Sequence, residues 1–293
     1  MRKYNYCTLP DGRKLSYMEF GKPDGHPVFY FHGSPSSCFE PLLIGEEIFY
    51  KFGLRIISPN RPGVGMSDFQ ENRTFNDWPK DVISLAKHLQ IDKFSIFGNS
   101  GGASYVVACA ALIPERLISA VVISGGWQMN MKETKKNLKF PFNIFWFLAR
   151  NFPFLLPTLL GTMKSSSTET KEKALEKAKK MSAPADFEAL KIGDRFEVLS
   201  KSTDEAILNK KGAAWDLRLY LKKLEINLEQ IAFPITFFHG ELDRNMPIEV
   251  ARLMTSKIPN TKLITYPGEA HLSMLCNHFV DAAEHLLQKG EGQ

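Results

Sequence analysis

Short apolar runs alternate with longer segments of helical spacing along most of this chain. Two runs near the start flank the turn signal Pro10-Asp11-Gly12 and predict a β-hairpin over residues 4–9 and 14–20. Further apolar runs predict buried strands at residues 28–31, 55–58, 94–97, 120–123, 234–238 and 261–266. Apolar residues three and four apart predict helices at 75–90, 103–113, 248–258 and 272–288. This order predicts an α/β fold, in which helices flank a mostly parallel central sheet with an antiparallel start.

The alternation of strands and helices stops once, between Gly126 and Trp215. Residues 127–215 carry no strand pattern and are rich in lysine and aromatic clusters. We therefore expect a helical cap over 127–215, inserted after the sixth strand, and a core domain formed by residues 1–126 and 216–293. Within the cap, residues 161–168 are typical of a linker and residues 169–181 of a charged amphipathic helix.

The first part of the cap, residues 140–156, is strongly apolar and aromatic. Three prolines in the run to Pro157, together with Lys139 and Arg150, argue against a helix that spans a membrane. Three hypotheses remain for these side chains. They form the core of the cap and its contact with the sheet, they line an apolar pocket for an acyl group, or they dip into a membrane surface. We favour the first and do not expect membrane contact.

A pentapeptide of the form G-x-S-x-G is centred on Ser100 and predicts a nucleophile elbow. It follows the apolar run 94–97 and precedes the helix pattern that begins at Ala103. Gly98 and Gly102 stand two residues on either side of the serine, where a strand that turns sharply into a helix leaves no room for a Cβ atom. The alternative is a tight turn whose serine only caps the helix.

An acid and a base follow Ser100 in the order that such an elbow requires. Asp243 comes just after the strand predicted at 234–238, and His271 comes after the strand at 261–266. Glu241 and Glu269 are the fallback acids. His278 and His285 lie inside the last helix pattern, about 10 Å apart along its axis, which is too far to share a metal.

Acyl transfer also needs hydrogen-bond donors for the oxyanion, and backbone amides supply them. One candidate is the N–H of Gly101, directly after the nucleophile. The second should come from the loop after the strand at 28–31, which contains Gly33 and Ser34, and the N–H of Ser34 is our candidate. The Ser34 hydroxyl is an optional third donor, and we expect His32 to brace this loop.

Composition agrees with a globular enzyme. The chain has 293 residues, of which 44% are hydrophobic, enough to bury a large core in one elaborated domain. The N-terminal residues lack an apolar stretch of signal-peptide length. The cysteines show neither paired spacing nor a metal-ligand pattern, which favours a reducing compartment, so we expect a cytoplasmic protein. They are Cys7, Cys38, Cys109 and Cys276.

The positive charge of the chain belongs to the cap. Residues 127–215 contain 16 basic and 10 acidic residues, a net charge of +6, whereas the rest of the chain has 21 and 22, a net charge of −1. Such a charge run is typical of a solvated face, and attraction of an anionic substrate or an anionic membrane surface are the alternatives. No basic and aromatic motif of a nucleic-acid-binding fold is present, so we expect no nucleic-acid partner.

These motifs occur in the order in which the α/β-hydrolase superfamily carries them, and the chain resembles that superfamily over nearly its whole length. Serine at position 100 is similar to the esterase and peptidase branches, whereas haloalkane dehalogenases and epoxide hydrolases carry aspartate there. Proline iminopeptidases usually have glycines where this chain has Ser34 and Ser36. Asn60 stands where the family more often has aspartate, a loss of one charge that we expect to leave the triad unaffected. The matching stretches are residues 31–35, 58–67, 98–102, 239–243 and 268–271.

We therefore expect a serine hydrolase in which His271, oriented by Asp243, activates Ser100 against a carboxylic ester with a small to medium apolar acyl group. The mechanism requires no metal and no organic cofactor, and its partner is a small-molecule substrate. Amide, thioester or carbon–carbon bond hydrolysis would use the same triad. A different class of function also remains open, because some members of the superfamily keep the triad and act as receptors that turn a ligand over slowly or once. The sequence leaves monomer and dimer open.

Overall fold

One eight-stranded sheet organises the computed structural model, which describes residues 3–164 and 171–288. The strand order is β1-β2-β4-β3-β5-β6-β7-β8, and only β2 runs antiparallel to its neighbours β1 and β4. The sequence predictions of a hairpin, a mostly parallel sheet and flanking helices are therefore confirmed. The strands are β1 (Asn5–Thr8), β2 (Lys14–Gly21), β3 (His26–Phe31), β4 (Leu54–Pro59), β5 (Phe94–Asn99), β6 (Leu117–Ile123), β7 (Ile235–Gly240) and β8 (Thr261–Tyr266).

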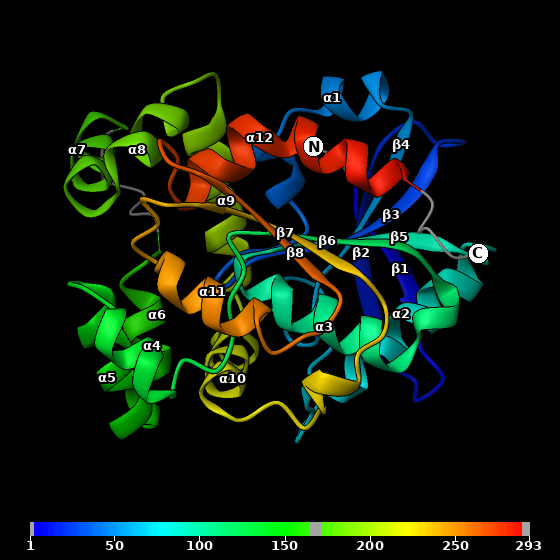
Figure 1. Ribbon diagram of the computed structural model, residues 1–293, viewed down its shortest axis with the longest axis horizontal. Helices are drawn as coiled ribbons and strands as arrows, with labels where there is room; N and C mark the ends of the chain where they lie inside the picture. The colour runs from blue at the N-terminus through cyan, green and yellow to red at the C-terminus, as the bar shows by residue number, and fades with distance from the viewer. Residues whose placement is uncertain (1–2, 165–170, 289–293) are drawn as a thin grey trace.

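Helices cover both faces of the sheet, as Figure 1 shows with the sheet seen nearly edge-on. One face packs against α1 (Glu46–Lys51) and α12 (His271–Leu287), and the other against α3 (Ala103–Leu112) and α11 (Ile248–Thr255), with α2 (Trp78–His88) packed on α3. Each face has its own buried apolar cluster. The carboxyl ends of the parallel strands meet at one edge of this layered structure, where the loops after β3, β5, β7 and β8 carry the candidate site residues.

The chain between β6 and β7 forms helices in its described part. The predicted boundary at Trp215 falls inside α10, which runs on to Leu221. Of the linker predicted at 161–168, residues 165–168 lie outside the described residues, as do the first two residues of the helix predicted at 169–181. We call the helices between β6 and β7 the insertion. They are α4 (Lys132–Asn137), α5 (Phe142–Asn151), α6 (Leu156–Gly161), α7 (Lys171–Met181), α8 (Pro184–Leu190), α9 (Arg195–Ala206) and α10 (Lys210–Leu221).

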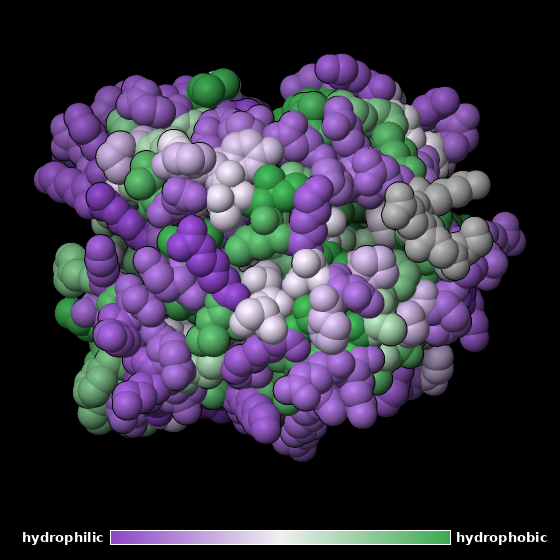
Figure 2. Space-filling model, viewed as in Figure 1, coloured by the Kyte–Doolittle hydropathy of each residue, from purple (hydrophilic) through white to green (hydrophobic). Residues whose placement is uncertain are grey.

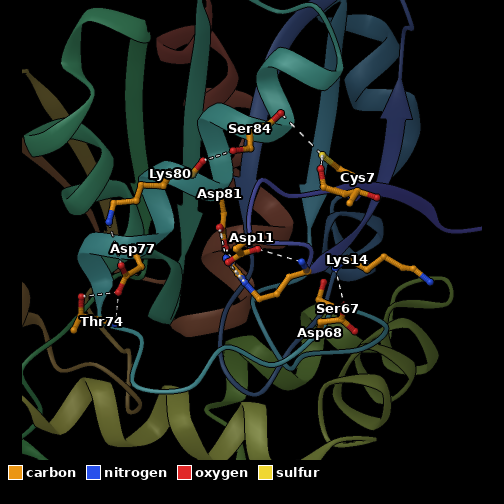
Figure 3. Close-up of polar contacts among 12 residues, drawn as sticks. Cys7, Asp11, Lys14, Ser67, Asp68, Thr74, Asp77, Lys80, Asp81 and Ser84 are labelled. Carbon is orange, nitrogen blue, oxygen red and sulfur yellow. Dashed lines mark hydrogen bonds and ion pairs between the residues drawn. The ribbon is translucent and has the colours of Figure 1, made fainter.

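Polar contacts join the N-terminal hairpin to α2 and to the loop after β4, as Figure 3 shows. The guanidinium of Arg13, in the hairpin turn, makes two hydrogen bonds of 2.7 and 3.0 Å to the carboxylate of Asp81 on α2. The backbone N–H of Lys14 donates to Asp68 over 2.7 Å. Bidentate pairing of this kind fixes geometry as well as charge, so the antiparallel start of the sheet is tied to the parallel part.

A fully buried charge cluster joins the insertion to the core. Asp216 on α10 accepts hydrogen bonds from Arg61 Nε at 2.7 Å, from Arg73, and from the Tyr105 hydroxyl at 2.9 Å. Burial alone would raise the pKa of Asp216, but the two guanidinium groups outweigh burial and lower it to about 2. Arg61 also donates to the carbonyl oxygens of His32 and Gly33. Asp216 therefore holds the loop after β3 through one arginine.

We expect Asp216→Ala to lower the free energy of unfolding by about 3–5 kcal/mol, because it leaves Arg61 and Arg73 charged, buried and without their carboxylate. Urea unfolding followed by circular dichroism measures the loss. The control Asp92→Ala removes a carboxylate that is 90% exposed and 3.6 Å from Arg116, and should change stability by less than about 0.5 kcal/mol. A loss of under about 1 kcal/mol for Asp216→Ala would show that the cluster does not fasten the insertion.

Candidate active site

Ser100 occupies the sharp turn between β5 and α3. Its φ is +52°, in the left-handed region that a non-glycine residue enters only at a cost in free energy. The flanking glycines permit this turn. A Cβ atom on Gly98 would lie 2.7 Å from Val106 Cγ2, and one on Gly102 would collide with the carbonyl oxygen of Phe31. The turn projects Ser100 from the end of the strand, as a nucleophile elbow requires.

Asp243 and His271 lie together at the ends of β7 and β8. Asp243 Oδ2 and His271 Nδ1 are 2.7 Å apart, and both side chains are buried. The other carboxylate oxygen, Oδ1, accepts the backbone N–H groups of Asn245 and Met246, each at 2.8 Å. The carboxylate is therefore fixed in its loop, and it in turn fixes the imidazole with Nε2 free of the acid.

The pKa of His271 is raised above its ordinary value. Burial alone would lower that pKa, but the Asp243 carboxylate, with further contributions from Asp186 and Glu40, outweighs burial and raises it. The neutral imidazole that accepts a proton is thus more basic than an ordinary buried histidine.

Asp186 is a site residue that the sequence did not indicate. It lies on α8 of the insertion, which packs against α12, and its Oδ1 accepts the backbone N–H groups of Leu272 at 2.7 Å and Ser273 at 2.9 Å. These are among the free N–H groups of the first turn of α12, which begins at His271. Asp186 therefore fixes the start of that helix and places a second negative charge near the imidazole.

A single cavity of about 1420 Å³ brings the separate motifs together. Ser100 and His271 line it, and so do Ser34 and Gly101. The aromatic part of the insertion forms much of the apolar wall, with Phe142, Phe145 and Trp146 on α5. The structure thus joins His271 to Asp243 by a hydrogen bond and sets Ser100 on the same cavity wall as His271.

The three residues predicted for the oxyanion site differ in what their N–H groups do. The N–H of Gly33 donates to Glu40 Oε2 at 2.9 Å, so it is already engaged. A Cβ atom on Gly33 would lie 3.3 Å from Ser100 Cβ. The glycine at this position therefore lets the loop after β3 pass close to Ser100. No hydrogen bond in the described part of the chain uses the N–H of Ser34. Ser34 and Gly101 therefore remain the backbone candidates.

The fallback acids, Glu241 and Glu269, are not among the residues that line the cavity. Glu241 accepts from the Thr265 hydroxyl at 2.8 Å, and Glu269 contacts His278 at 3.0 Å. His32 is buried, and its Nδ1 lies 2.9 Å from the carbonyl oxygen of Gly33, an arrangement that fits a bracing role. Within residues 3–164 and 171–288, no three His, Cys, Asp or Glu side chains form a group that could hold a metal ion.

The side chain of Asn60 joins several buried segments by hydrogen bonds. It is buried, its Oδ1 accepts the N–H of Cys38 at 2.7 Å, and its Nδ2 donates to Ser16 and to Glu205 Oε1 at 3.0 and 3.1 Å. Glu205 lines the cavity. An aspartate at position 60 would have no N–H to offer this carboxylate and would add a like charge beside it.

Tyr220 is the second site residue that the sequence did not indicate. It lies on α10, lines the cavity and is buried, yet its hydroxyl has no hydrogen-bond partner among the described residues. The hydroxyl lies directly against Gly101, because a Cβ atom on that glycine would collide with it. Burial raises the pKa of Tyr220 well above its usual value, so the group keeps its proton and remains a donor.

Comparison with known proteins places this geometry in a family. A family model described as alpha/beta hydrolase fold matches residues 26–277. A proline iminopeptidase from Arabidopsis thaliana is 31% identical over 129 residues, and a probable one from Leptolyngbya boryana is 28% identical over 147. These alignments cover 43% and 49% of this chain but only 33% and 41% of the two relatives.

Other relatives and solved structures match nearly end to end, and they include a haloalkane dehalogenase from Psychrobacter cryohalolentis that is 26% identical over 96% of this chain and 84% of that protein. A bifunctional esterase/perhydrolase from Acinetobacter calcoaceticus is 23% identical over 275 residues, which cover 91% of this chain and 92% of that protein. A hydrolase from Pseudomonas aeruginosa has the same fold, with a TM-score of 0.68 at 16% identity over 97% of both chains. With its elbow, its sheet topology and the match over residues 26–277, this chain belongs to the alpha/beta hydrolase fold family, and its relatives support a hydrolase role.

Proposed function

We propose that this protein is a serine hydrolase that cleaves carboxylic esters with an apolar acyl group of small to medium size. The observation that carries the proposal is the 2.7 Å hydrogen bond between Asp243 and His271 on a cavity that Ser100 also lines. An oriented imidazole that shares a cavity with a serine in a strained turn is positioned to take the proton of that serine and make its hydroxyl nucleophilic.

The proposed reaction has two halves. His271 Nε2 takes the proton of Ser100 Oγ as that oxygen bonds to the ester carbonyl carbon, and the carbonyl oxygen becomes an oxyanion. The N–H groups of Gly101 and Ser34 hold the oxyanion. The C–O bond to the alcohol then breaks, and His271 returns the proton to the departing alkoxide. Water repeats the steps on the acyl-enzyme, which releases the acid and restores Ser100.

The Tyr220 hydroxyl adds a donor on the side of Gly101. It is buried and has no hydrogen-bond partner among the described residues, and an unsatisfied buried hydroxyl is costly unless a ligand satisfies it. We propose that the Tyr220 hydroxyl donates a hydrogen bond to a substrate oxygen, either the developing oxyanion or the neighbouring ester oxygen.

Apolar acyl groups fit the cavity best. Its wall includes Phe142, Phe145, Trp146 and Leu217, and burial of such surface favours apolar substrate groups by about 25 cal/mol per Å². The relative from Acinetobacter calcoaceticus, which is named an esterase, aligns over nearly the whole chain and supports this class. Proline iminopeptidase relatives keep amide hydrolysis as a second candidate, and their alignments cover under half of their own length.

Ser100→Ala should leave the fold intact and lower the turnover of p-nitrophenyl esters at least about 1,000-fold, because the nucleophile is lost. The control Ser104→Ala removes a buried hydroxyl on α3 that has no partner in the described structure and should keep the turnover. A series of acyl lengths from acetate to decanoate then ranks substrates. Ser100→Ala with full activity would overturn the proposal. A single turnover followed by stalling in the unmodified protein would favour a receptor that keeps the triad.

Tyr220→Phe should lower kcat about 10- to 100-fold with little change in KM, because it removes a donor that acts on the transition state. The unfolding midpoint should not move, since the hydroxyl forms no hydrogen bond within residues 3–164 and 171–288. Tyr17→Phe makes the same chemical change in the buried part of β2 and should leave kcat unchanged. An unchanged kcat in Tyr220→Phe would assign the residue to packing alone.

The pH profile should report the raised pKa of His271. Activity requires the neutral imidazole, so kcat/KM should rise with pH through that pKa, at a higher pH than the usual value of about 6.5. Asp186→Asn keeps an oxygen for the N–H groups of α12 but removes the charge, so the rise should move to lower pH. Glu188→Gln, on the exposed side of the same helix, should not move it. A profile that stays in place in Asp186→Asn would contradict the electrostatic role.

A further inference from the structure

An exposed apolar stripe runs along the outer face of α5 and the turn after it. Its members are Phe140, Ile144, Phe147, Phe152 and Phe154, and they are 74%, 50%, 54%, 40% and 70% exposed. Ile144 and Phe147 are three residues apart on α5, so they share one side of that helix, and Phe140 lies just before the helix begins. Figure 2 shows hydrophobic side chains along the lower left edge of the molecule, where Figure 1 draws α4, α5 and α6.

The opposite side of α5 is also apolar. Phe142, Phe145 and Trp146 line the cavity that contains Ser100, and Ala149 is buried. α5 is therefore apolar on two sides, with Asn143, Arg150 and Asn151 as its polar residues, and an apolar side of a helix is expected to be covered by protein or by lipid. In the described structure its inner side is partly buried and faces the cavity, whereas its outer side is exposed. Single exposed apolar residues are normal on a protein surface, but five of them within one short segment are not.

The chain around the stripe is strongly basic. Residues 127–164 contain six basic residues and one acidic residue, Glu133, a net charge of +5. Four of the lysines directly precede the stripe and are exposed. They are Lys132, Lys135, Lys136 and Lys139.

Although the sequence alone led us to expect no membrane contact, we propose that the exposed apolar stripe and these four lysines dock the insertion on an anionic lipid bilayer surface. The aromatic side chains enter the boundary between headgroups and acyl chains, and the lysines face the anionic headgroups. A second copy of the chain is a poorer occupant, because a symmetric contact through the stripe would bring the two basic clusters together. No single described helix is long and apolar enough to cross a membrane. The helical segment Pro153–Gly161 follows α5 at a bend of 112°, which suits a segment that lies in the membrane interface.

The proposed docking places the cavity next to the bilayer, so that an apolar ester dissolved in the lipid can enter the cavity directly. The two sides of one helix, α5, form the proposed lipid contact and part of the cavity wall, so an ester leaving the bilayer passes only the thickness of a helix to reach the cavity. This second step rests on the proposed ester hydrolysis, whereas the docking itself does not.

Co-sedimentation with vesicles tests the docking with the full chain carrying Ser100→Ala, so that lipid turnover does not interfere. Vesicles of phosphatidylcholine alone are compared with vesicles containing about 30% phosphatidylglycerol. We expect binding to the anionic vesicles that weakens at high salt. The triple substitution Ile144→Ser, Phe147→Ser and Phe154→Ser should weaken binding at least about tenfold. Tyr50→Ser, at a residue 56% exposed on α1, is the matched control and should leave binding unchanged.

Charge reversal tests the lysines independently of the stripe. Lys135→Glu with Lys136→Glu should weaken binding to anionic vesicles at least about tenfold, whereas Lys179→Glu with Lys180→Glu, the same charge change on exposed lysines of α7, should have a much smaller effect. Equal effects of the two pairs, or no binding to anionic vesicles, would overturn the proposal. A dimer in solution that the stripe substitutions dissociate would assign the stripe to a second copy instead.

The two proposals fail separately. Normal turnover of soluble p-nitrophenyl butyrate without vesicle binding would remove the docking and leave the esterase. Vesicle binding without turnover of any ester would leave the docking and remove the proposed function.

Discussion

The buried ion cluster at Asp216 is the interaction on which the site depends. One carboxylate with almost no solvent exposure is shared by two arginines, and one of these, Arg61, also donates to the carbonyl oxygens of the loop that carries Ser34. Buried charges are tolerated only when every partner is present, so the cluster fixes the distance between α10 and the core. Tyr220 lies four residues after Asp216, on the same side of α10, and is thereby held against Gly101.

The insertion therefore does more than cover the cavity. Asp216 and Tyr220 come from α10, and Asp186 comes from α8, where it fixes the first turn of the helix that begins with His271. The core supplies the residues of the proposed chemistry, namely the elbow at Ser100 and the hydrogen-bonded pair of Asp243 and His271. The insertion fixes the positions of Tyr220 and of the first turn of α12. It also contributes to the pKa of His271, which burial lowers, Asp243 raises and the Asp186 charge raises further.

The sequence was informative where function depends on local backbone geometry. The glycines at 98 and 102 indicate a turn that only small residues permit, and Asp243 and His271 each follow a predicted strand, so parallel topology brings them to one edge. Tyr220, Asp186 and Glu40 could not be found in this way, because their roles arise from tertiary packing and their local patterns are ordinary. A single acid within the apolar run 212–221 was the one available signal for Asp216. For residues 140–156, the pattern could not separate cavity wall from exposed stripe, because α5 is apolar on both sides.

The central claim is that Ser100 is the activated nucleophile of this site. Treatment of the native protein with a fluorophosphonate, followed by peptide mapping by mass spectrometry, tests it most directly, since this reagent forms a stable bond only with a serine that a neighbouring base has activated. We expect one adduct per chain, located on Ser100, and no adduct when the protein is unfolded before treatment. An adduct on another residue, or none on the folded protein, would contradict it.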